Sequence, residues 1–373
     1  MPASLPRSPT LDELRAYAVS RSLFKPTTLP AAIRRLGFVQ ADPIRAPARA
    51  QDLTLRHRVT GYRAGDLEAR YPRLAIEEDH FINYGFLPRA TQALMHPRAA
   101  AADWPAERAR QAAAVLAYVQ HRGVVHPREV DAEFAHGKAL NWFGGASNAS
   151  TQLLEAMHYR GLLRVARRDG GVRLYAVREA PTAAAADPQA AIDALVDVVV
   201  AKYAPLPTAT LGDLVSRLRS GVPQWQALRG GALQRARARL PQARVAGVDW
   251  VWPAGEDPAA SRHARAARRD ALRLLAPFDP VVWDRRRFEM LWGWAYRFEA
   301  YTPASRRVRG YYALPLLWRD RVIGWANLQQ QGGALECSMG HVAGRPPADA
   351  GYRLALQAEL DRMENFLRPG GAA

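Results

Sequence analysis

The sequence predicts an α+β fold in which tandem winged-helix modules are followed by a C-terminal antiparallel β-barrel-like domain. Three observations predict it. Residues 100–180 have the pattern of three helices and then a two-stranded hairpin, which is the element order of a winged helix. A looser version of this order follows over residues 181–262. Beyond residue 263 the pattern changes to runs of alternating apolar and polar side chains, as in antiparallel strands.

The first module is predicted as helix, helix, strand and helix. Apolar residues recur at helical spacing from Leu11 to Ala18, and a second helix runs up to Gly37, a residue type that commonly ends helices. The apolar run 38–44 indicates a strand. Residues 45–59 return to a helical pattern that carries several arginines.

The second module carries the clearest signals. Helices are predicted over about 105–121, over 124–134 and from Ser150 onward, and the Asp-Gly-Gly turn at 169–171 is a strong hairpin signal. The third helix would be the recognition helix, with the hairpin as the wing, although a winged helix can also serve only for packing. The candidate contact residues are Thr151, Gln152, Glu155, His158, Tyr159 and Arg160 on the helix, and Arg164, Arg167, Arg168 and Arg173 on the wing.

The rest of the chain contains a linker and, further on, a change from helical to strand-like patterns of apolar residues. An alanine- and proline-rich stretch, 179–191, is the clearest linker, and after it helical segments and strand material repeat the winged-helix order in degenerate form. A helix over 261–275 then precedes three alternating runs that predict an antiparallel meander or small barrel. These runs are 296–303, 310–318 and 321–329, and a last helix covers 346–367. The predicted domains are 1–99 (N-terminal winged-helix module with a Gln-x-Asp motif), 100–180 (second winged-helix module), 181–262 (third, winged-helix-like module) and 263–373 (β-rich domain with a terminal helix).

The charge balance favours polyanionic partners. Lysine and arginine together number 52 against 35 aspartates and glutamates, for a formal net charge of +17. Such a field attracts nucleic acid. Only three of the 52 are lysines, so 49 are arginines, and part of this excess could reflect codon usage. A solvated basic surface with no specific function is the alternative.

Composition also excludes several classes of protein. Cys337 is the only cysteine, which excludes an intrachain disulfide and a thiolate metal cluster. The nine histidines show no paired metal spacing, so we expect neither a metal nor a cofactor. The N-terminal stretch lacks the apolar core of a signal peptide, and no run of about 18 apolar residues indicates a membrane span. We therefore expect a monomeric, cytoplasmic and nucleoid-associated protein without a membrane partner.

A glutamine and an aspartate occur two positions apart in the strand-like run, as Gln40-Ala41-Asp42. Alternate side chains of an extended segment share a face, which would place the amide and the carboxylate roughly 6 to 7 Å apart along the strand. The triplet also has an ordinary interpretation as a strand end, because Asp-Pro, here Asp42-Pro43, is a common turn initiator.

Cations and aromatic side chains are predicted to meet at one hairpin of the C-terminal domain. Such side chains can stack on bases and contact phosphates, although tyrosines that pack the domain beside solvated arginines would give the same pattern. The hairpin residues are Tyr301, Arg306, Arg307, Arg309, Tyr311 and Tyr312. In the nearby segment PFDPVVWDR, a structural ion-pair corner is favoured for Asp279, Asp284 and Arg285.

Three stretches together carry a family resemblance: VQADPIRAPARAQDLTLRHRV (39–59), the block 100–180, and the run from Leu274 to Trp325 that begins LLAPFDPVVWDRRRFEMLW. From about residue 10 to 365 the sequence resembles the AlkZ/YcaQ-type winged-helix DNA glycosylases, which include crosslink-repair DNA glycosylases. The resemblance implies three tandem winged-helix modules and a C-terminal β-barrel surrounding a DNA channel. It also implies that Gln40 and Asp42 form the Gln-Φ-Asp version of the family's catalytic motif.

The implied activity is excision of N7-alkylguanine-type or crosslinked bases from duplex DNA. Alkylation at N7 makes guanine a cationic, good leaving group, so the reaction chiefly needs a carboxylate that stabilises the sugar cation and accepts a proton from the attacking water. Asp42 suits this role, and Gln40 would position the water. No lysine lies near the motif in the sequence, which predicts a monofunctional enzyme that leaves an abasic site. The predicted DNA contacts are Arg49, Arg58, Arg167, Arg168, Arg306, Arg307, Arg309 and Tyr311.

Two other functions remain open at the level of sequence. A non-catalytic winged-helix DNA-binding protein, such as a transcriptional regulator, would give a sequence-specific footprint and would bind without the Asp42 carboxylate. An unrelated RNA-binding protein would prefer single-stranded RNA to duplex DNA. The Gln-x-Asp motif, and the lack of an evident effector-binding module, favour the enzyme.

Overall fold

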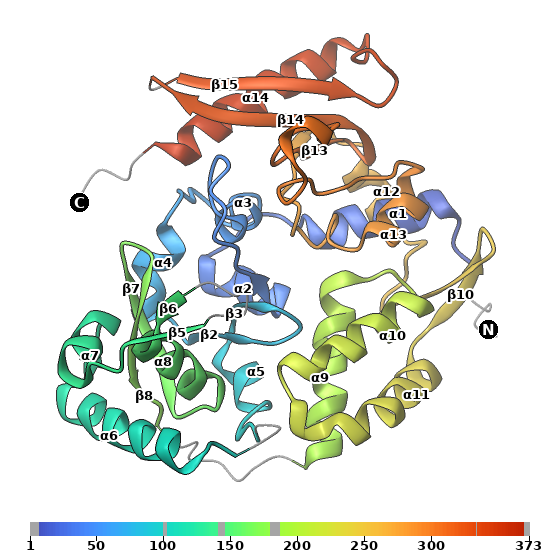
Figure 1. Ribbon diagram of the computed structural model, residues 1–373. Coiled ribbons are helices and arrows are strands. Elements are labelled where there is room, and N and C mark those ends of the chain that lie inside the picture. Colours follow the sequence, from blue (N-terminus) through green and yellow to red (C-terminus); the bar gives the residue numbers. More distant parts are fainter. Residues whose placement is uncertain (1–6, 100–102, 141–145, 180–186, 333, 369–373) are drawn as a thin grey trace. The chain divides into compact units, whose positions relative to one another are not determined.

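The computed structural model describes residues 7–99, 103–140, 146–179, 187–332 and 334–368, and its helices and strands form a mixed α/β fold (Figure 1). The chain divides into two compact units. One unit comprises Met1–Asp66, Val196–Val215 and Leu233–Ala373, and the other comprises Leu67–Leu195 and Ser216–Ala232. The chain therefore passes between the units several times, because α9, α10 and α11 each begin in one unit and end in the other.

The second unit contains the region in which the sequence predicted three helices followed by a hairpin. Strands β7 and β8 form that hairpin, with Gly170 and Gly171 at its turn in positive-φ conformations of 53° and 91°. With β4 they make a sheet in the order β4-β8-β7, beside helices α6, α7 and α8. The hairpin and the three helices thus lie where the sequence patterns predicted them. The unit's elements are α4 (Asp66–Arg70), β2 (Ile76–His80), β3 (Tyr84–Pro88), α5 (Arg89–Ala93), α6 (Ala106–Arg122), β4 (Val124–Val125), α7 (Pro127–Phe134), β5 (Lys138–Leu140), β6 (Ala146–Asn148), α8 (Ala149–Tyr159), β7 (Leu163–Asp169), β8 (Val172–Val177) and the first half of α9 (Pro188–Tyr203).

The first unit begins with a well-capped helix. The Thr10 side chain accepts a hydrogen bond from the backbone N–H of Glu13, and the Glu13 carboxylate accepts one from the backbone N–H of Thr10, which is a capping box. The unit also holds a small sheet in the order β10-β11-β9. Its elements are α1 (Leu11–Ser22), α2 (Leu29–Leu36), β1 (Val39–Gln40), α3 (Ala50–Leu55), β9 (Leu206–Pro207), α10 (Thr208–Arg217), α11 (Arg229–Arg239), β10 (Gln242–Val245), β11 (Val248–Val251), α12 (Ser261–Ala267), β12 (Leu272–Leu274), α13 (Arg285–Trp292), β13 (Leu314–Trp318), β14 (Arg321–Gln331), β15 (Ala334–His341) and α14 (Ala350–Leu367).

The C-terminal strands form a sheet rather than a closed barrel. Four antiparallel strands lie in the order β12-β13-β14-β15, and within the described residues no pairing joins β12 to β15. Helix α14 runs along this sheet (Figure 1), and the ring of its residue Tyr352 contacts those of Trp318 and His341. The barrel-like prediction is corrected accordingly: the strands pair only with their neighbours, and both outer strands remain edges.

Two segments differ from the expected secondary structure. Residues 296–303 alternate in polarity but form no strand, because their aromatic side chains attach to the sheet by packing instead of by a backbone ladder. Tyr296 is buried and donates a hydrogen bond to the carbonyl of Ala313, and Phe298 packs edge-on against Tyr312 with 5.3 Å between ring centroids. The helix expected to continue to 275 ends at Ala267, and Leu272–Leu274 is instead strand β12, paired with β13.

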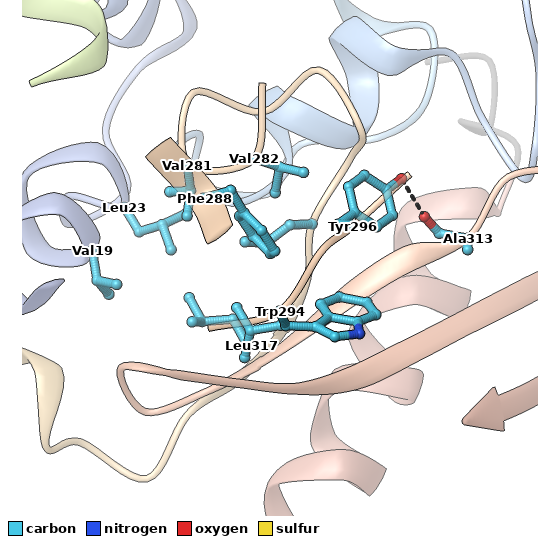
Figure 2. Close-up of a cluster of buried hydrophobic side chains, with 11 residues drawn as sticks. Val19, Leu23, Val281, Val282, Phe288, Trp294, Tyr296, Ala313 and Leu317 are labelled. Carbon is cyan, nitrogen blue, oxygen red and sulfur yellow. Dashed lines mark hydrogen bonds between the residues drawn. The ribbon is translucent and has the colours of Figure 1, made fainter. Parts of the chain in front are cut away.

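A cluster of buried side chains ties the first helix to the C-terminal part of the same unit (Figure 2). Val19 of α1 and Leu23, which caps the C-terminal end of that helix, pack with Phe288 of α13 and with Leu317 of β13. Each fully buried aliphatic or aromatic side chain of this kind contributes about 1.5 to 3 kcal/mol relative to an exposed one. The cluster thus holds α13 and the aromatic segment around Trp294 in fixed positions. No helix in the described part of the chain has the length and apolar character needed to cross a membrane.

Candidate active site

Gln40 is the last residue of the two-residue strand β1. The strand follows directly on α2, which ends at Gly37 in a left-handed conformation with φ of 66°. A Cβ at Gly37 would lie 2.7 Å from the side chain of Val198, so a close approach of α9 requires glycine here. Phe38 and Val39 are fully buried and anchor the strand. The indole N–H of Trp283 donates a 2.9 Å hydrogen bond to Oε1 of Gln40, which orients the amide.

Asp42 lies beyond the strand, in a turn. Its Oδ1 accepts a 2.9 Å hydrogen bond from the backbone N–H of Ile44, and its own N–H donates to Oε1 of Gln51 at 3.3 Å. Strand β1 ends at Gln40, and the Asp42 side chain then forms a local turn across Pro43 by accepting from the N–H of Ile44. Asp42-Pro43 therefore forms a turn, which was its ordinary interpretation. Because the strand ends before Asp42, the side chains of Gln40 and Asp42 do not share one face of a strand as expected.

Burial raises the pKa of the half-buried Asp42 carboxyl, and the hydrogen bond from Ile44 opposes that shift. The carboxylate is also near two tyrosines of the C-terminal segment. Burial first, and then the charge of Asp42, raise the pKa values of both Tyr301 and Tyr312. Tyr301 is 79% exposed whereas Tyr312 is 3% exposed. The structure thus brings an exposed aromatic ring close to a partly desolvated carboxylate 259 positions earlier in the chain, the difference between 301 and 42.

Sequence reasoning missed a lysine close to this strand. Lys202 on α9 is buried, and its ammonium donates a hydrogen bond to the carbonyl of Phe38, two residues before Gln40. Burial and the neighbouring charge of Arg58 lower the pKa of Lys202 to about 7, with Asp279 opposing that shift. The expectation that no lysine lies near the motif is wrong in three dimensions. No pattern in the sequence links positions 38 and 202, because only the packing of α9 joins them.

Arg58 does not contact solvent, so the prediction that it binds DNA is wrong. Its side chain is fully buried and makes two hydrogen bonds to the carboxylate of Asp279, at 2.8 and 3.0 Å. It also donates to the carbonyls of Ser22 and Thr54. The helical pattern of 45–59 placed Arg58 on the polar side. In the structure α3 ends at Leu55, so that periodicity does not reach it.

The predicted ion-pair corner is structural, but its residues do not pair with one another. Asp279 pairs with Arg58. Asp284 caps α13 by accepting from the backbone N–H groups of Arg286 and Arg287, and it accepts a 2.6 Å hydrogen bond from the Thr210 hydroxyl. Arg285 donates to the carbonyls of Pro277 and Val282.

The wing arginines differ in what they contact. Arg167 is exposed, whereas Arg168 forms an ion pair with the fully buried carboxylate of Glu78. The guanidinium of Arg168 is thus bonded to a carboxylate of the same unit. Arg168 is not the exposed phosphate contact that the wing pattern predicted. On the expected recognition helix, His158 is also buried and hydrogen-bonds the carbonyl of Glu78.

The cationic and aromatic residues predicted at a C-terminal hairpin lie in a segment, residues 301–312, that contains no strand, so the expected hairpin is wrong there. Some of these side chains are exposed and others make structural contacts. Arg306 is exposed, and Tyr311 is 44% exposed with the guanidinium of Arg307 5.0 Å from its ring centroid. Arg309 is half-buried, donates to the carbonyl of Ala295, and lies 5.0 Å from the ring centroid of Trp294. Arg49, at the N-terminal end of α3, is half-buried. The alternating cations and rings predicted here are therefore present, with Tyr312 packed inside.

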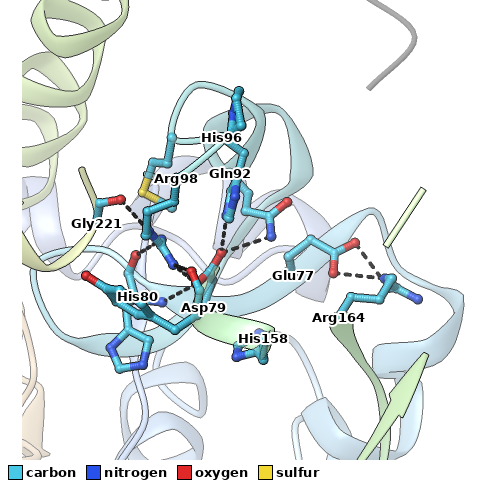
Figure 3. A network of polar contacts seen from close by, with 12 residues as sticks. Glu77, Asp79, His80, Gln92, His96, Arg98, His158, Arg164 and Gly221 are labelled. Atoms are coloured by element: carbon cyan, nitrogen blue, oxygen red, sulfur yellow. Dashed lines mark hydrogen bonds and ion pairs between the residues drawn. The ribbon is translucent and has the colours of Figure 1, made fainter. Parts of the chain in front are cut away.

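A second polar cluster lies in the other unit (Figure 3). The carboxylate of Asp79 accepts from Gln92 at 3.0 Å and from Arg98 at 3.1 Å, and lies 2.8 Å from Nε2 of His96. Burial raises the pKa of Asp79, but the His96 hydrogen bond and the Arg98 charge outweigh it and leave the pKa below its ordinary range. Burial lowers the pKa of His96 to about 4. Because these groups are buried and bonded to one another, the cluster is a structural network.

No group of three or more histidine, cysteine, aspartate and glutamate side chains within the described residues could hold a metal ion. The residues around Gln40 and Asp42 thus offer acid–base and hydrogen-bonding chemistry from a carboxylate, an amide, an indole and a tyrosine.

Comparison with known proteins places this arrangement in a family. The family model described as DNA glycosylase AlkZ-like matches residues 33–366, a span that includes both Gln40 and Asp42. Among solved structures, the chain is similar to the DNA glycosylase AlkZ of Streptomyces sahachiroi, with a TM-score of 0.62 and 15% sequence identity over 96% of this chain and 97% of that one. At that identity the structural match shows only that the two chains share a fold. The DNA glycosylase activity is inferred from the match to the family model. The chain belongs to the AlkZ-like family of DNA glycosylases.

Proposed function

We propose that this DNA glycosylase excises N7-alkylguanine-type or crosslinked bases from duplex DNA and leaves an abasic site. The observation that carries the proposal is the arrangement around Asp42. A partly desolvated carboxylate lies beyond a strand whose last residue, Gln40, has its amide oriented by Trp283, and an exposed tyrosine, Tyr301, lies within the field of the carboxylate. A carboxylate beside an exposed ring suits a cationic base or sugar.

The chemistry needs little more than this set of groups. When the bond between C1′ and N9 breaks, its electron pair neutralises the positive charge of the alkylated base, and the deoxyribose becomes oxocarbenium-like. Asp42 stabilises that cation and accepts a proton from the water whose oxygen bonds to C1′. Gln40 can assist through its amide, whose N–H₂ group is able to donate to the water oxygen while Oε1 accepts from the indole of Trp283.

Duplex DNA would be held by exposed cations and rings. Arg306 and Tyr311 are exposed near the C-terminal sheet, and Arg167 is exposed on the β7–β8 hairpin. Extrusion of a nucleotide costs a few kcal/mol, which phosphate contacts offset. Helices α6, α7 and α8 with the β7–β8 hairpin support a winged-helix assignment for 100–180. The further proposed domains are 1–99, 181–262 and 263–373, whereas the two compact units divide the chain after residues 66, 195, 215 and 232. The proposed contact residues are Arg49, Arg167, Arg306, Arg307, Arg309 and Tyr311.

The direct test is single-turnover release of a base from duplex DNA. Wild-type protein in excess is mixed with duplex DNA that contains 7-methylguanine, and separately with a nitrogen-mustard crosslink, and the freed base is quantified. Release that is slowed in Gln40→Ala supports the proposal. Tight duplex binding without release of either base, together with a sequence-specific footprint, would instead indicate a DNA-binding regulator.

Trp283 is expected to act as a positioning residue. Trp283→Phe keeps an aromatic ring but removes the hydrogen bond to Gln40, a loss of about 0.5 to 1.5 kcal/mol, so the excision rate should fall roughly two- to thirteenfold. DNA affinity should stay unchanged. Trp292→Phe is the matched control, since it removes an indole hydrogen bond to the Asp320 carbonyl in the same unit. Equal losses of rate in both variants would show a general packing effect.

Excision should depend on pH through Asp42. The base form of a carboxyl is required, and the pKa of Asp42 is raised by burial, so the rate should fall on acidification with a midpoint above the ordinary aspartate value of about 3.9. The measurement is the single-turnover rate on 7-methylguanine DNA between about pH 4 and 8, with duplex binding followed in parallel. If the rate does not change down to about pH 4, Asp42 is not the general base of the reaction.

The enzyme should form no covalent imine with DNA, even though Lys202 lies close to β1. Its ammonium is buried and bonded to the Phe38 carbonyl, so it does not reach a sugar carbon. Reaction in the presence of borohydride should therefore trap no protein–DNA adduct. A trapped adduct that is lost in Lys202→Met would overturn this and identify a lyase.

A further inference from the structure

A basic cavity lies in the first unit, among residues not assigned to the candidate active site. It has a volume of about 590 Å³ and is bounded by the ends of α1 and α3, by strand β12 and by α14. Seven lysine and arginine residues line it within the described part of the chain, and no aspartate or glutamate does. These cationic residues are Lys25, Arg56, Arg63, Arg269, Arg273, Arg362 and Arg368.

One carboxylate lies behind this lining. Glu359 of α14 is fully buried, forms ion pairs with Arg56 and Arg362, and accepts a 2.8 Å hydrogen bond from the backbone N–H of Leu274. Its single charge balances at most one of the seven cations. Burial and the charge of Arg56 hold the pKa of the lining residue His57 well below its usual value, so His57 adds no charge at neutral pH. Glu359 thus holds Arg56 and Arg362 in place, but it does not neutralise the positive charge of the residues that line the cavity.

Arg273 on β12 is the most informative lining residue. It is half-buried, and no hydrogen bond or ion pair is formed by its guanidinium within the described residues. Burial lowers its pKa, Glu359 opposes that shift, and the neighbouring Arg362 adds to it. Side chains of arginine are rarely left desolvated and unpaired, because the loss of hydration is costly. The guanidinium groups of this wall are therefore short of an anionic partner.

Another basic cavity of the same unit shows the contrast. It is lined by Arg21, Arg35, Lys202 and Arg262, but it also contains Glu256, which pairs with Arg21. That lining has four cationic residues and one carboxylate, whereas the cavity around Arg273 has seven cationic residues and no carboxylate. The excess of positive charge is therefore larger in the cavity around Arg273.

We infer that the cavity around Arg273 binds phosphate groups. Guanidinium groups bind phosphate oxygens with two parallel hydrogen bonds, and several cations from separate segments match a ligand that carries more than one phosphate. The groups come either from the backbone of bound duplex DNA, which rests on the proposed function, or from a free polyphosphate. In either case the ligand supplies the negative charge that the walls lack.

The test uses inorganic tripolyphosphate and undamaged duplex DNA with the full chain. Isothermal titration calorimetry should show tripolyphosphate binding to wild type, weakened about tenfold in Arg273→Gln. Arg269→Gln, a change at an exposed lining residue, is a second variant in case Arg273→Gln folds poorly. Arg345→Gln removes one exposed arginine outside the cavity and is the matched control. It should bind tripolyphosphate as wild type does.

The source of the phosphate is resolved by competition. If it is the DNA backbone, tripolyphosphate displaces duplex DNA, and Arg273→Gln reduces the slope of log affinity against log salt by about 1. If it is a free polyphosphate, DNA and tripolyphosphate bind together. The inference is overturned if neither ligand distinguishes Arg273→Gln and Arg269→Gln from Arg345→Gln. Neither ligand requires base excision, so a failure here is separate from a failure of the proposed reaction.

Discussion

Asp42→Asn is expected to reduce excision of 7-methylguanine by about 100- to 10,000-fold while duplex affinity is unchanged, because a positioned general base typically contributes a factor of that size. The substitution is nearly isosteric, and the asparagine Oδ1 can still accept the hydrogen bond from Ile44. The turn should therefore persist, and only the charge and the proton acceptor are removed. Single-turnover rates measured beside fluorescence-anisotropy titrations with undamaged duplex would separate the two effects.

Asp249→Asn is the matched control for that experiment. Asp249 is exposed on β11 and forms a surface ion pair with Arg244 at 3.2 Å, so its loss changes the net charge equally without approaching the motif. Equal rates for Asp42→Asn and wild type would exclude a catalytic carboxylate at position 42. A fall in rate that follows a fall in affinity would point to a binding role instead.

Loss of one partner of the Arg58–Asp279 pair should destabilise the protein by about 3 to 5 kcal/mol, since it leaves an uncompensated charge in the interior. Both side chains are fully buried, and Arg58 also holds the carbonyls of Ser22 and Thr54. Asp279→Ala and Arg58→Met should each show this loss in urea unfolding followed by tryptophan fluorescence. The double variant should recover part of it, because apolar groups can replace a buried pair at small net cost.

The surface pair Arg244–Asp249 provides the comparison. Exposed pairs contribute about 0 to 1 kcal/mol, so Asp249→Ala should change the free energy of unfolding by no more than that. A similarly small effect for Asp279→Ala would mean that water reaches the Arg58 site. A double variant less stable than both single variants would mean that the hydrogen bonds of Arg58 to the backbone dominate over the ion pair.

Arginines that look equivalent in the sequence make different contacts in the structure. Arg58 and Arg49 lie in one arginine-rich stretch, yet Arg58 is fully buried and pairs with a carboxylate 221 positions away, whereas Arg49 is half-buried. Arg167 and Arg168 are neighbours on one strand, and the second is taken up by Glu78. Local periodicity indicates which side of a helix or strand is polar. It does not indicate which polar groups become partners after distant segments pack.

The β7–β8 hairpin, the helices before it and the Gln-x-Asp motif could be predicted from sequence because each depends on residues close together in the chain, and the family could be recognised from three stretches of it. The remaining features depend on contacts between distant segments. Such contacts leave the C-terminal strands as an open sheet, bond Trp283 to Gln40, bring Lys202 to Phe38 and gather Arg273 and six other cationic residues in one cavity. The physical reason is that burial and pairing of polar groups join segments from across the chain, and these contacts leave no periodic signal in the sequence.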